Sequence, residues 1–216
     1  MNSISHDIRQ YIENSIIPRY AAFDKAHRAD HVNMVINRSL ELAEQMPRLD
    51  KSMLYVAAAF HDLGLVNGRE RHHIDSRIIL ESDPFVKAHF TTDQIRLMGE
   101  AVEDHRASKS GRPRNDYGLI VAEADRLIDP ETIIRRTIQY GLRNYPHLDR
   151  EGHYDRTVSH VTAKYGPNGY LKILISWSDN AARLDELRRI LADKVAFRHT
   201  FDRIFDHETL TDNPHA

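Results

Sequence analysis

The sequence predicts an all-α fold, a multi-helix bundle with a C-terminal helical extension. Apolar residues recur at steps of three and four along most of the chain, which is the period of an amphipathic helix. One run, Met53 to Phe60, is apolar nearly all round and suits a central buried helix. The only strand-like segment, Leu171 to Ile175, is too isolated to support a sheet.

The same patterns place the helices in chain order. A first stripe, made by Val32, Val35, Ile36, Leu40 and Ala43, ends before Pro47. We expect the buried helix to end at Gly64. Further helices are expected at residues 95–102, 117–128 and 131–140, with Pro130 beginning the last of these, and over 179–205 as one long helix or a broken pair. Loops are signalled at 64–68, 108–116 and 166–169.

Length and composition limit the class of protein. The 216 residues fit a single domain over 1–216, in which about 147–210 is expected to form a helical extension. Thirty Lys and Arg against 32 Asp and Glu give a net charge of −2, which argues against binding of nucleic acid by bulk electrostatics. The longest apolar run, Leu54 to Phe60, is far too short for a membrane span, and the N-terminus lacks an apolar signal core. We therefore expect a soluble, cytoplasmic protein.

The chain has 14 histidines and no cysteine, which excludes thiolate chemistry and sulfur-ligated metal sites. Four residues lie on inward faces of three expected helices: His31, His61, Asp62 and Asp125. Asp62 also falls near the negative, C-terminal end of its helix, where a carboxylate costs up to about 1 kcal/mol. Because an unpaired buried carboxylate would neutralise or destabilise the fold, both aspartates need a cationic partner. Nitrogen and oxygen ligands of this kind favour a divalent ion of the Mn²⁺, Fe²⁺, Co²⁺, Ni²⁺ or Zn²⁺ type over Ca²⁺.

Two further histidines are placed to hold a second ion beside the first, with Asp62 as the bridge. His105 continues the apolar stripe of the 95–102 helix, and His72 opens another expected helix. His73 competes with His72 for this role. One ion and two ions both remain open, and Mg²⁺ stays among the candidates.

The ordered set of His31, the His61–Asp62 doublet and Asp125 resembles the H…HD…D signature of the HD-domain metal-dependent phosphohydrolases. The doublet lies in AAAFHDLG and the last aspartate in VAEADRLID. The resemblance covers roughly Ala26 to Tyr140, and it implies an all-α fold and a divalent metal held by these four residues. It also implies hydrolysis of a phosphoester or phosphoanhydride, often in a nucleotide. His72 and His105 resemble the two extra histidines of the binuclear members.

Such a site predicts attack of metal-activated water on a phosphate. A bound ion lowers the pKa of its water toward neutrality and withdraws charge from the phosphoryl oxygens. Besides Asp62, the catalytic candidates are Glu103 and Asp104, which precede His105 and could orient a water or an imidazole. Positive side chains are needed at the non-bridging oxygens. The candidates for that contact are Arg69, Arg71, Arg106, Lys109, Arg112 and Arg114.

The leading interpretation is a phosphohydrolase of a small phosphorylated molecule, in first place a nucleotide. One alternative is a catalytically silent signalling module that binds metal or nucleotide, although a complete ligand set argues against decay. Another is a di-iron oxygenase, because some HD-domain proteins use two irons, and it would need both His72 and His105. No nucleic-acid or membrane partner is expected, and the sequence is compatible with a homo-oligomer.

Overall fold

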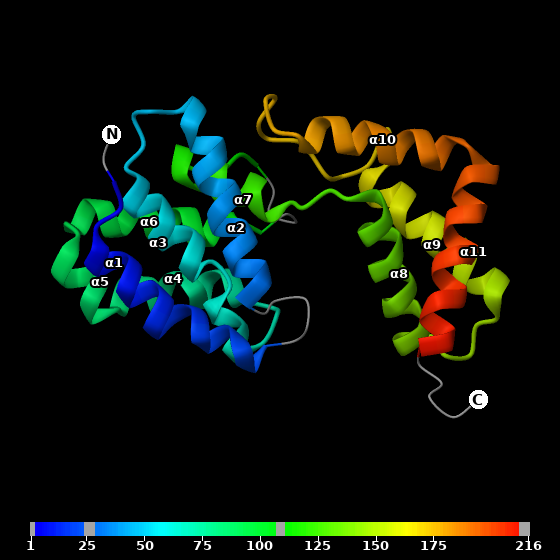
Figure 1. The fold of residues 1–216 in the computed structure, drawn as a ribbon, viewed down its shortest axis with the longest axis horizontal. Helices are drawn as coiled ribbons and strands as arrows, with labels where there is room; N and C mark the ends of the chain where they lie inside the picture. Colours follow the sequence, from blue (N-terminus) through cyan, green and yellow to red (C-terminus); the bar gives the residue numbers. More distant parts are fainter. Residues whose placement is uncertain (1–2, 24–28, 107–110, 212–216) are drawn as a thin grey trace. The chain divides into compact units, whose positions relative to one another are not determined.

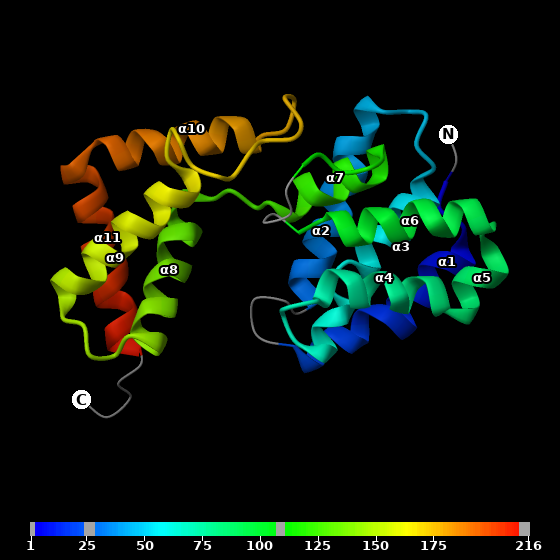
Figure 2. The same cartoon turned by 180° about the vertical axis from the view of Figure 1, so that it is seen from behind.

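The computed structural model describes residues 3–23, 29–106 and 111–211, and contacts divide the chain into two compact units, residues 1–126 and 127–216. Every regular element in these ranges is a helix, which confirms the all-α prediction (Figures 1 and 2). None of the described helices combines the length and the apolar character that a bilayer span requires.

The first unit is built around one buried helix, α3. Its elements are α1 (His6–Tyr11), η1 (Ile12–Ile16), η2 (Ile17–Ala22), α2 (Ala29–Leu42), η4 (Ala43–Gln45), α3 (Lys51–Phe60), η5 (Leu63–Asn67), α4 (His72–Ser82), α5 (Pro84–His89), α6 (Thr92–Asp104) and α7 (Asp116–Asp125). The Asp50 side chain caps α3 by accepting the backbone N–H groups of Ser52 and Met53. All residues from Met53 to Phe60 are buried, because α3 packs against α2, α4, α6 and α7. The prediction of a central buried helix is confirmed.

The end of α3 differs from the prediction. The helix stops at Phe60 with His61 as its C-cap, so Asp62 lies just beyond the last turn, with φ −111° and ψ 5°. Gly64 does not terminate α3 and lies within η5. A Cβ on Gly64 would be 2.1 Å from the His72 carbonyl oxygen and 2.5 Å from the Ser76 nitrogen. The glycine therefore permits close approach of η5 to the start of α4.

Helices α2, α4, α6 and α7 match predicted positions, with shifted ends, whereas α1, η1, η2 and α5 were not predicted. Helix α6 begins with a capping box formed by Thr91 and Gln94. Helix α7 begins after its cap, Asn115, and ends at Asp125, three residues before the expected end at Ile128. As a result Asp125, like His61 and His105, lies at the C-terminal end of a helix.

The second unit contains α8 (Pro130–Asn144), α9 (Arg150–Tyr165), α10 (Asn180–Ala192) and α11 (Lys194–Thr211). Pro130 opens α8 as predicted, and the 179–205 segment is the broken pair, interrupted at Asp193. The segment 171–175 is neither helix nor strand. The resemblance places the 131–140 helix in the metal-binding core at about 26–140. In the structure α8 packs with α9 and α11, and its isoleucines join the Phe197–Phe205 apolar cluster. That the whole chain behaves as a single domain stays a prediction.

Candidate metal centre

Six predicted ligands come together in the first unit, from helix ends that are distant in sequence. His31 comes from α2, His61 and Asp62 from the end of α3, His72 from the start of α4, His105 from the end of α6 and Asp125 from the end of α7. The His61 side chain is fully buried, and Asp62 and His105 are nearly so. Each histidine in this cluster has an Nε2 atom within 3.7 Å of an Asp62 oxygen.

The first group of potential ligands lies on one side of the Asp62 carboxylate. The Nε2 atoms of His31 and His61 are 3.4 Å apart. Asp62 Oδ2 lies 3.3 Å from His61 Nε2 and 3.7 Å from His31 Nε2. Asp125 Oδ1 completes the group, 3.2 Å from His31 Nε2. The atoms of His31, His61 and Asp62 lie close enough together to share one ion, and Asp125 lies beside the two histidines.

The second group lies on the other oxygen of the same carboxylate. Asp62 Oδ1 is 3.5 Å from His72 Nε2 and 3.4 Å from His105 Nε2, and these two nitrogens are 3.2 Å apart. The structure thus brings His72, and not His73, to Asp62. One carboxylate offers one oxygen to each histidine pair.

Three of the imidazoles are oriented by backbone carbonyls. Nδ1 of His61 lies 2.8 Å from the Ala58 carbonyl oxygen, and Nδ1 of His72 lies 2.8 Å from that of Arg69. Nδ1 of His105 is 2.5 Å from the carbonyl of the residue three positions earlier. Because a carbonyl only accepts, Nδ1 must donate, so the Nε2 lone pair of a neutral ring faces the cluster. This is the tautomer in which a histidine binds a metal through Nε2.

The donor set fits divalent ions. Two ligands about 2.1 Å from one ion, at angles of about 90–109°, are about 3.0–3.4 Å apart. The Nε2–Nε2 distances of 3.4 Å for His31–His61 and 3.2 Å for His72–His105 lie in this range. In the second pair, Nδ1 of both His72 and His105 donates to a carbonyl, so the two neutral rings direct their Nε2 lone pairs at each other, and a shared cation removes that repulsion.

The charges of the metal-free cluster compensate one another. Burial would lower the pKa of His61, but the carboxylates of Asp62 and Asp125 outweigh it and raise that pKa to about 9. Burial would raise the pKa of Asp125, but the hydrogen bond from His31 and the charge of His61 lower it to about 2. The neighbouring imidazoles of His61 and His105 likewise hold the pKa of Asp62 well below its usual value against the effect of burial.

These shifts predict how the stability of the metal-free protein depends on pH. A histidine whose pKa rises on folding from 6.5 to about 9 stabilises the fold fully below pH 6.5, and this contribution is lost as the pH rises through about 9. The contribution of Asp125 is present above its unfolded value of 3.8 and is lost as the pH falls through about 2. We therefore expect the unfolding free energy of the chelated protein, measured in urea, to fall by an amount on the order of 3 kcal/mol between pH 6.5 and 9.5. His61→Asn should lack this fall, and an equal fall in the variant would contradict the assignment.

Tyr20, which no spacing pattern singles out, supports the centre from η2. Its fully buried hydroxyl donates to the Ala59 carbonyl oxygen at 2.9 Å and lies 3.4 Å from the Asp62 backbone N–H, which donates to it. It therefore joins the open end of α3 to the residue that lies between the two histidine pairs. The sequence shows only a tyrosine in an apolar stretch, so this role depends on tertiary packing.

Replacement of Tyr20 by phenylalanine should loosen Asp62. The variant leaves the Ala59 carbonyl and the Asp62 N–H without their partner, at a cost of about 1–3 kcal/mol in unfolding free energy. Isothermal titration with Mn²⁺ should also show weaker binding. Tyr55→Phe is the matched control, since Tyr55 is a buried tyrosine of α3 outside both ligand groups. Equal Mn²⁺ affinity of Tyr20→Phe and the wild type would refute the role.

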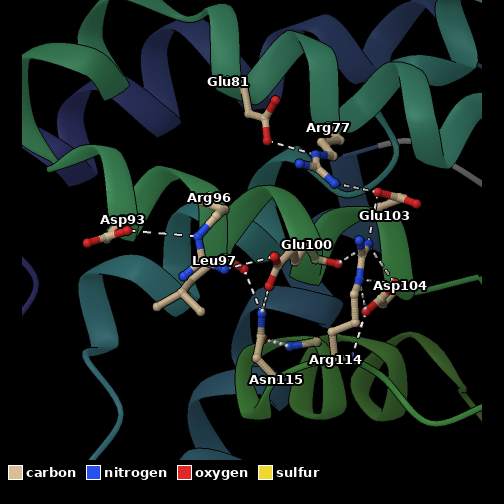
Figure 3. A network of polar contacts seen from close by, with 11 residues as sticks. Arg77, Glu81, Asp93, Arg96, Leu97, Glu100, Glu103, Asp104, Arg114 and Asn115 are labelled. Atoms are coloured by element: carbon tan, nitrogen blue, oxygen red, sulfur yellow. Dashed lines mark hydrogen bonds and ion pairs between the residues drawn. The ribbon is translucent and has the colours of Figure 1, made fainter.

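The predicted catalytic carboxylates Glu103 and Asp104 are engaged by arginines in the structure (Figure 3). The Arg114 guanidinium contacts Asp104 Oδ1 at 2.8 Å and Glu103 Oε2 at 2.8 Å, and its backbone N–H donates to Asp104. Arg77, from α4, contacts Glu103 at 2.7 Å and Glu81 at 2.7 Å. These contacts tie the end of α6, which carries His105, to α4, which carries His72. Glu103 and Asp104 lie in neither ligand group of the described residues.

The predicted phosphate-binding residues are placed differently from one another. Arg106 donates to the Glu70 carbonyl at 2.7 Å, which joins the segment after His105 to the segment before His72. Arg69 and Arg71 lie in that latter segment and are exposed. Arg112 is exposed, Arg114 is held by acids, and Lys109 lies outside the described residues.

The first unit is therefore a helical domain whose helix ends carry a polar cluster of four histidines and two aspartates. A family model of the HD domain matches residues 28–128, which include all six of these residues. This segment of the chain is similar to HD domains, which bind divalent metals and occur in a superfamily of metal-dependent phosphohydrolases. Searches of curated proteins and of solved structures gave no significant match.

Proposed function

We propose that the protein is a metal-dependent phosphohydrolase that cleaves a phosphoester or phosphoanhydride of a small phosphorylated molecule, in first place a nucleotide. The observation that carries the proposal is the position of Asp62, with one oxygen facing His31 and His61 and the other facing His72 and His105. A carboxylate shared in this way is the bridging ligand that a two-ion site requires.

Each part of the chain has a defined task in this proposal. Two bound divalent ions would supply an activated water and withdraw charge from the phosphoryl oxygens. The backbone carbonyls of Ala58, Arg69 and Val102 keep the imidazoles of His61, His72 and His105 oriented with Nε2 toward the cluster. The nitrogen-rich donor set favours a first-row transition ion over Mg²⁺, which prefers oxygen ligands.

In this proposal the substrate phosphate contacts arginines of two segments that flank the second ligand group in sequence. Arg71 directly precedes His72, Arg69 lies two residues earlier, and Arg106 directly follows His105. The bond from Arg106 to the Glu70 carbonyl holds these segments together. Arg114 has a different task in the proposal, since its guanidinium neutralises Asp104 and Glu103 and so positions the end of α6. Lys109 and Arg112 stay predictions from the sequence.

The proposal is tested by an activity panel. Nucleoside mono-, di- and triphosphates and simple phosphomonoesters are offered to the protein after loading with Mn²⁺, Fe²⁺, Co²⁺, Ni²⁺, Zn²⁺ or Mg²⁺, and phosphate release is measured. We expect release with at least one substrate and none above background with Asp62→Asn. Equal rates for the two proteins on every substrate that is turned over would overturn the proposal.

One observation also favours a second candidate, a di-iron oxygenase. That chemistry needs both His72 and His105 beside the first ion, and the structure brings both to Asp62. The metal decides between the two functions, because hydrolysis proceeds with redox-inactive Zn²⁺ and oxygenation does not. Oxygen consumption that appears only with iron, without phosphate release, would favour the oxygenase. Tight nucleotide binding without turnover under any metal would favour the silent module.

A further inference from the structure

The second unit contains a cavity of about 500 Å³ between α8 and α9 whose described lining is basic and free of acids. Arg136, Arg156 and Lys164 contribute three positive charges, and His160 lies among them. The surplus is local, because residues 127–216 carry 13 Lys and Arg against 13 Asp and Glu. The volume is in the range of about 300–1,000 Å³ that is typical of small-molecule sites.

These cations are not neutralised by the protein. No ion pair joins Arg136, Arg156 or Lys164 to a carboxylate within the described ranges, and Arg156 Nε is a buried donor without a hydrogen-bond partner there. Burial lowers the pKa of Arg156, against the opposing effect of Tyr145 and Tyr140. Elsewhere in the unit arginines do pair with acids: Arg135 with Glu208, Arg150 with Asp202, Arg198 with Glu151 and Arg203 with Glu131. These four arginines are therefore neutralised by carboxylates of the unit, whereas the cations of the cavity face none of its described carboxylates.

Two exposed aromatic rings accompany the cations. The Arg156 guanidinium carbon lies 5.6 Å from the Tyr140 ring centroid and 5.4 Å from that of Tyr145, and the two rings are 6.3 Å apart. The two tyrosines are 56% and 39% exposed. Exposed rings beside a cation offer a stacking surface for a planar heterocycle.

We propose that this cavity binds a nucleotide, with its phosphates on Arg136, Arg156 and Lys164 and its base against Tyr140 or Tyr145. The three cations would bind the phosphates of the nucleotide, and the two rings would bind its planar base. Inorganic phosphate as the ligand would leave the two exposed rings without a function. No residue of the cavity belongs to the metal centre, so the site is additional to the proposed phosphohydrolase site.

Calorimetry on the full-length, metal-stripped chain tests the proposal with ADP as the probe. Removing the metal prevents turnover, so the outcome does not depend on the phosphohydrolase proposal. We expect saturable binding that weakens as NaCl is raised, because the contacts are between charges. Adenosine has the base without the phosphates, and inorganic pyrophosphate has the phosphates without the base, so both should bind more weakly than ADP. Absence of saturable ADP binding, or pyrophosphate binding as tight as that of ADP, would overturn the assignment.

Variants locate the binding within the chain. The exposed Arg136→Gln and the Lys164→Gln replacements, combined, should weaken ADP binding by about tenfold or more, since each removes a charge-assisted contact. Tyr140→Ser should weaken ADP binding and leave that of pyrophosphate unchanged. Arg189→Gln, at an exposed helical arginine outside the cavity, is the matched control and should bind as the wild type does. If circular dichroism shows all variants folded and the double variant binds ADP normally, the cavity is not the site.

Discussion

Replacing Asp62 by asparagine is expected to remove bound metal from both ligand groups at once. The carboxylate is the one group of the cluster that faces all four Nε2 atoms, and an amide supplies one weaker oxygen and a competing N–H₂. Metal analysis should fall from two ions per chain to fewer than one. Phosphate release should fall by about 10²–10³-fold or more, the scale on which single groups that stabilise transition-state charge act.

A control separates this effect from the loss of any acid. Asp116→Asn removes a carboxylate of α7 that pairs with the exposed Arg48 and belongs to neither ligand group. Such exposed pairs contribute little to stability, about 0–1 kcal/mol. This variant should keep both ions and full activity. Retention of two ions by Asp62→Asn would contradict the bridging position.

Replacing Gly64 by alanine should remove the second ligand group and leave the first. The new methyl group would meet the His72 carbonyl oxygen at 2.1 Å and the Ser76 nitrogen at 2.5 Å, both backbone atoms that cannot rotate away. The start of α4 must therefore shift, and His72 shifts with it. We expect a loss on the order of 3 kcal/mol in unfolding free energy and one ion per chain in place of two.

Gly68→Ala is the matched control for this variant. Gly68 has φ 98°, which alanine adopts only with strain, but no atom lies within 4 Å of the added Cβ. The control should lose about 1–3 kcal/mol of stability through strain. It should nevertheless keep both ions. Two ions and wild-type stability in Gly64→Ala would show that the close approach of η5 to α4 does not position His72.

Several helices and the inward positions of the candidate ligands could be predicted because both depend on local pattern. Periodicity locates α3 and α6, and the inward positions of His31, His61 and Asp125 follow from the same stripes. Helix ends were less predictable. A glycine after an apolar helix commonly ends that helix, whereas Gly64 allows the close approach of η5 to the start of α4.

The remaining features depend on contacts between distant residues. Tyr20 reaches Asp62 across 42 positions, and nothing in either local sequence indicates it. The choice of His72 over His73 is decided by where α4 begins relative to Asp62. Arg114 is basic and follows His105, as a phosphate ligand would, yet it contacts Asp104 because the chain between α6 and α7 brings it there. The local sequence around Tyr20, His72 and Arg114 does not distinguish these roles from the alternatives.

The central claim is that one carboxylate, that of Asp62, joins two metal positions in the first unit. Anomalous diffraction from crystals of the Mn²⁺-loaded protein tests it most directly. We predict two peaks, one beside Asp62 Oδ2 with His31 and His61 and one beside Oδ1 with His72 and His105, about 3.5–4 Å apart. A single peak at full Mn²⁺ loading, or peaks that leave Asp62 without a metal contact, would contradict the account.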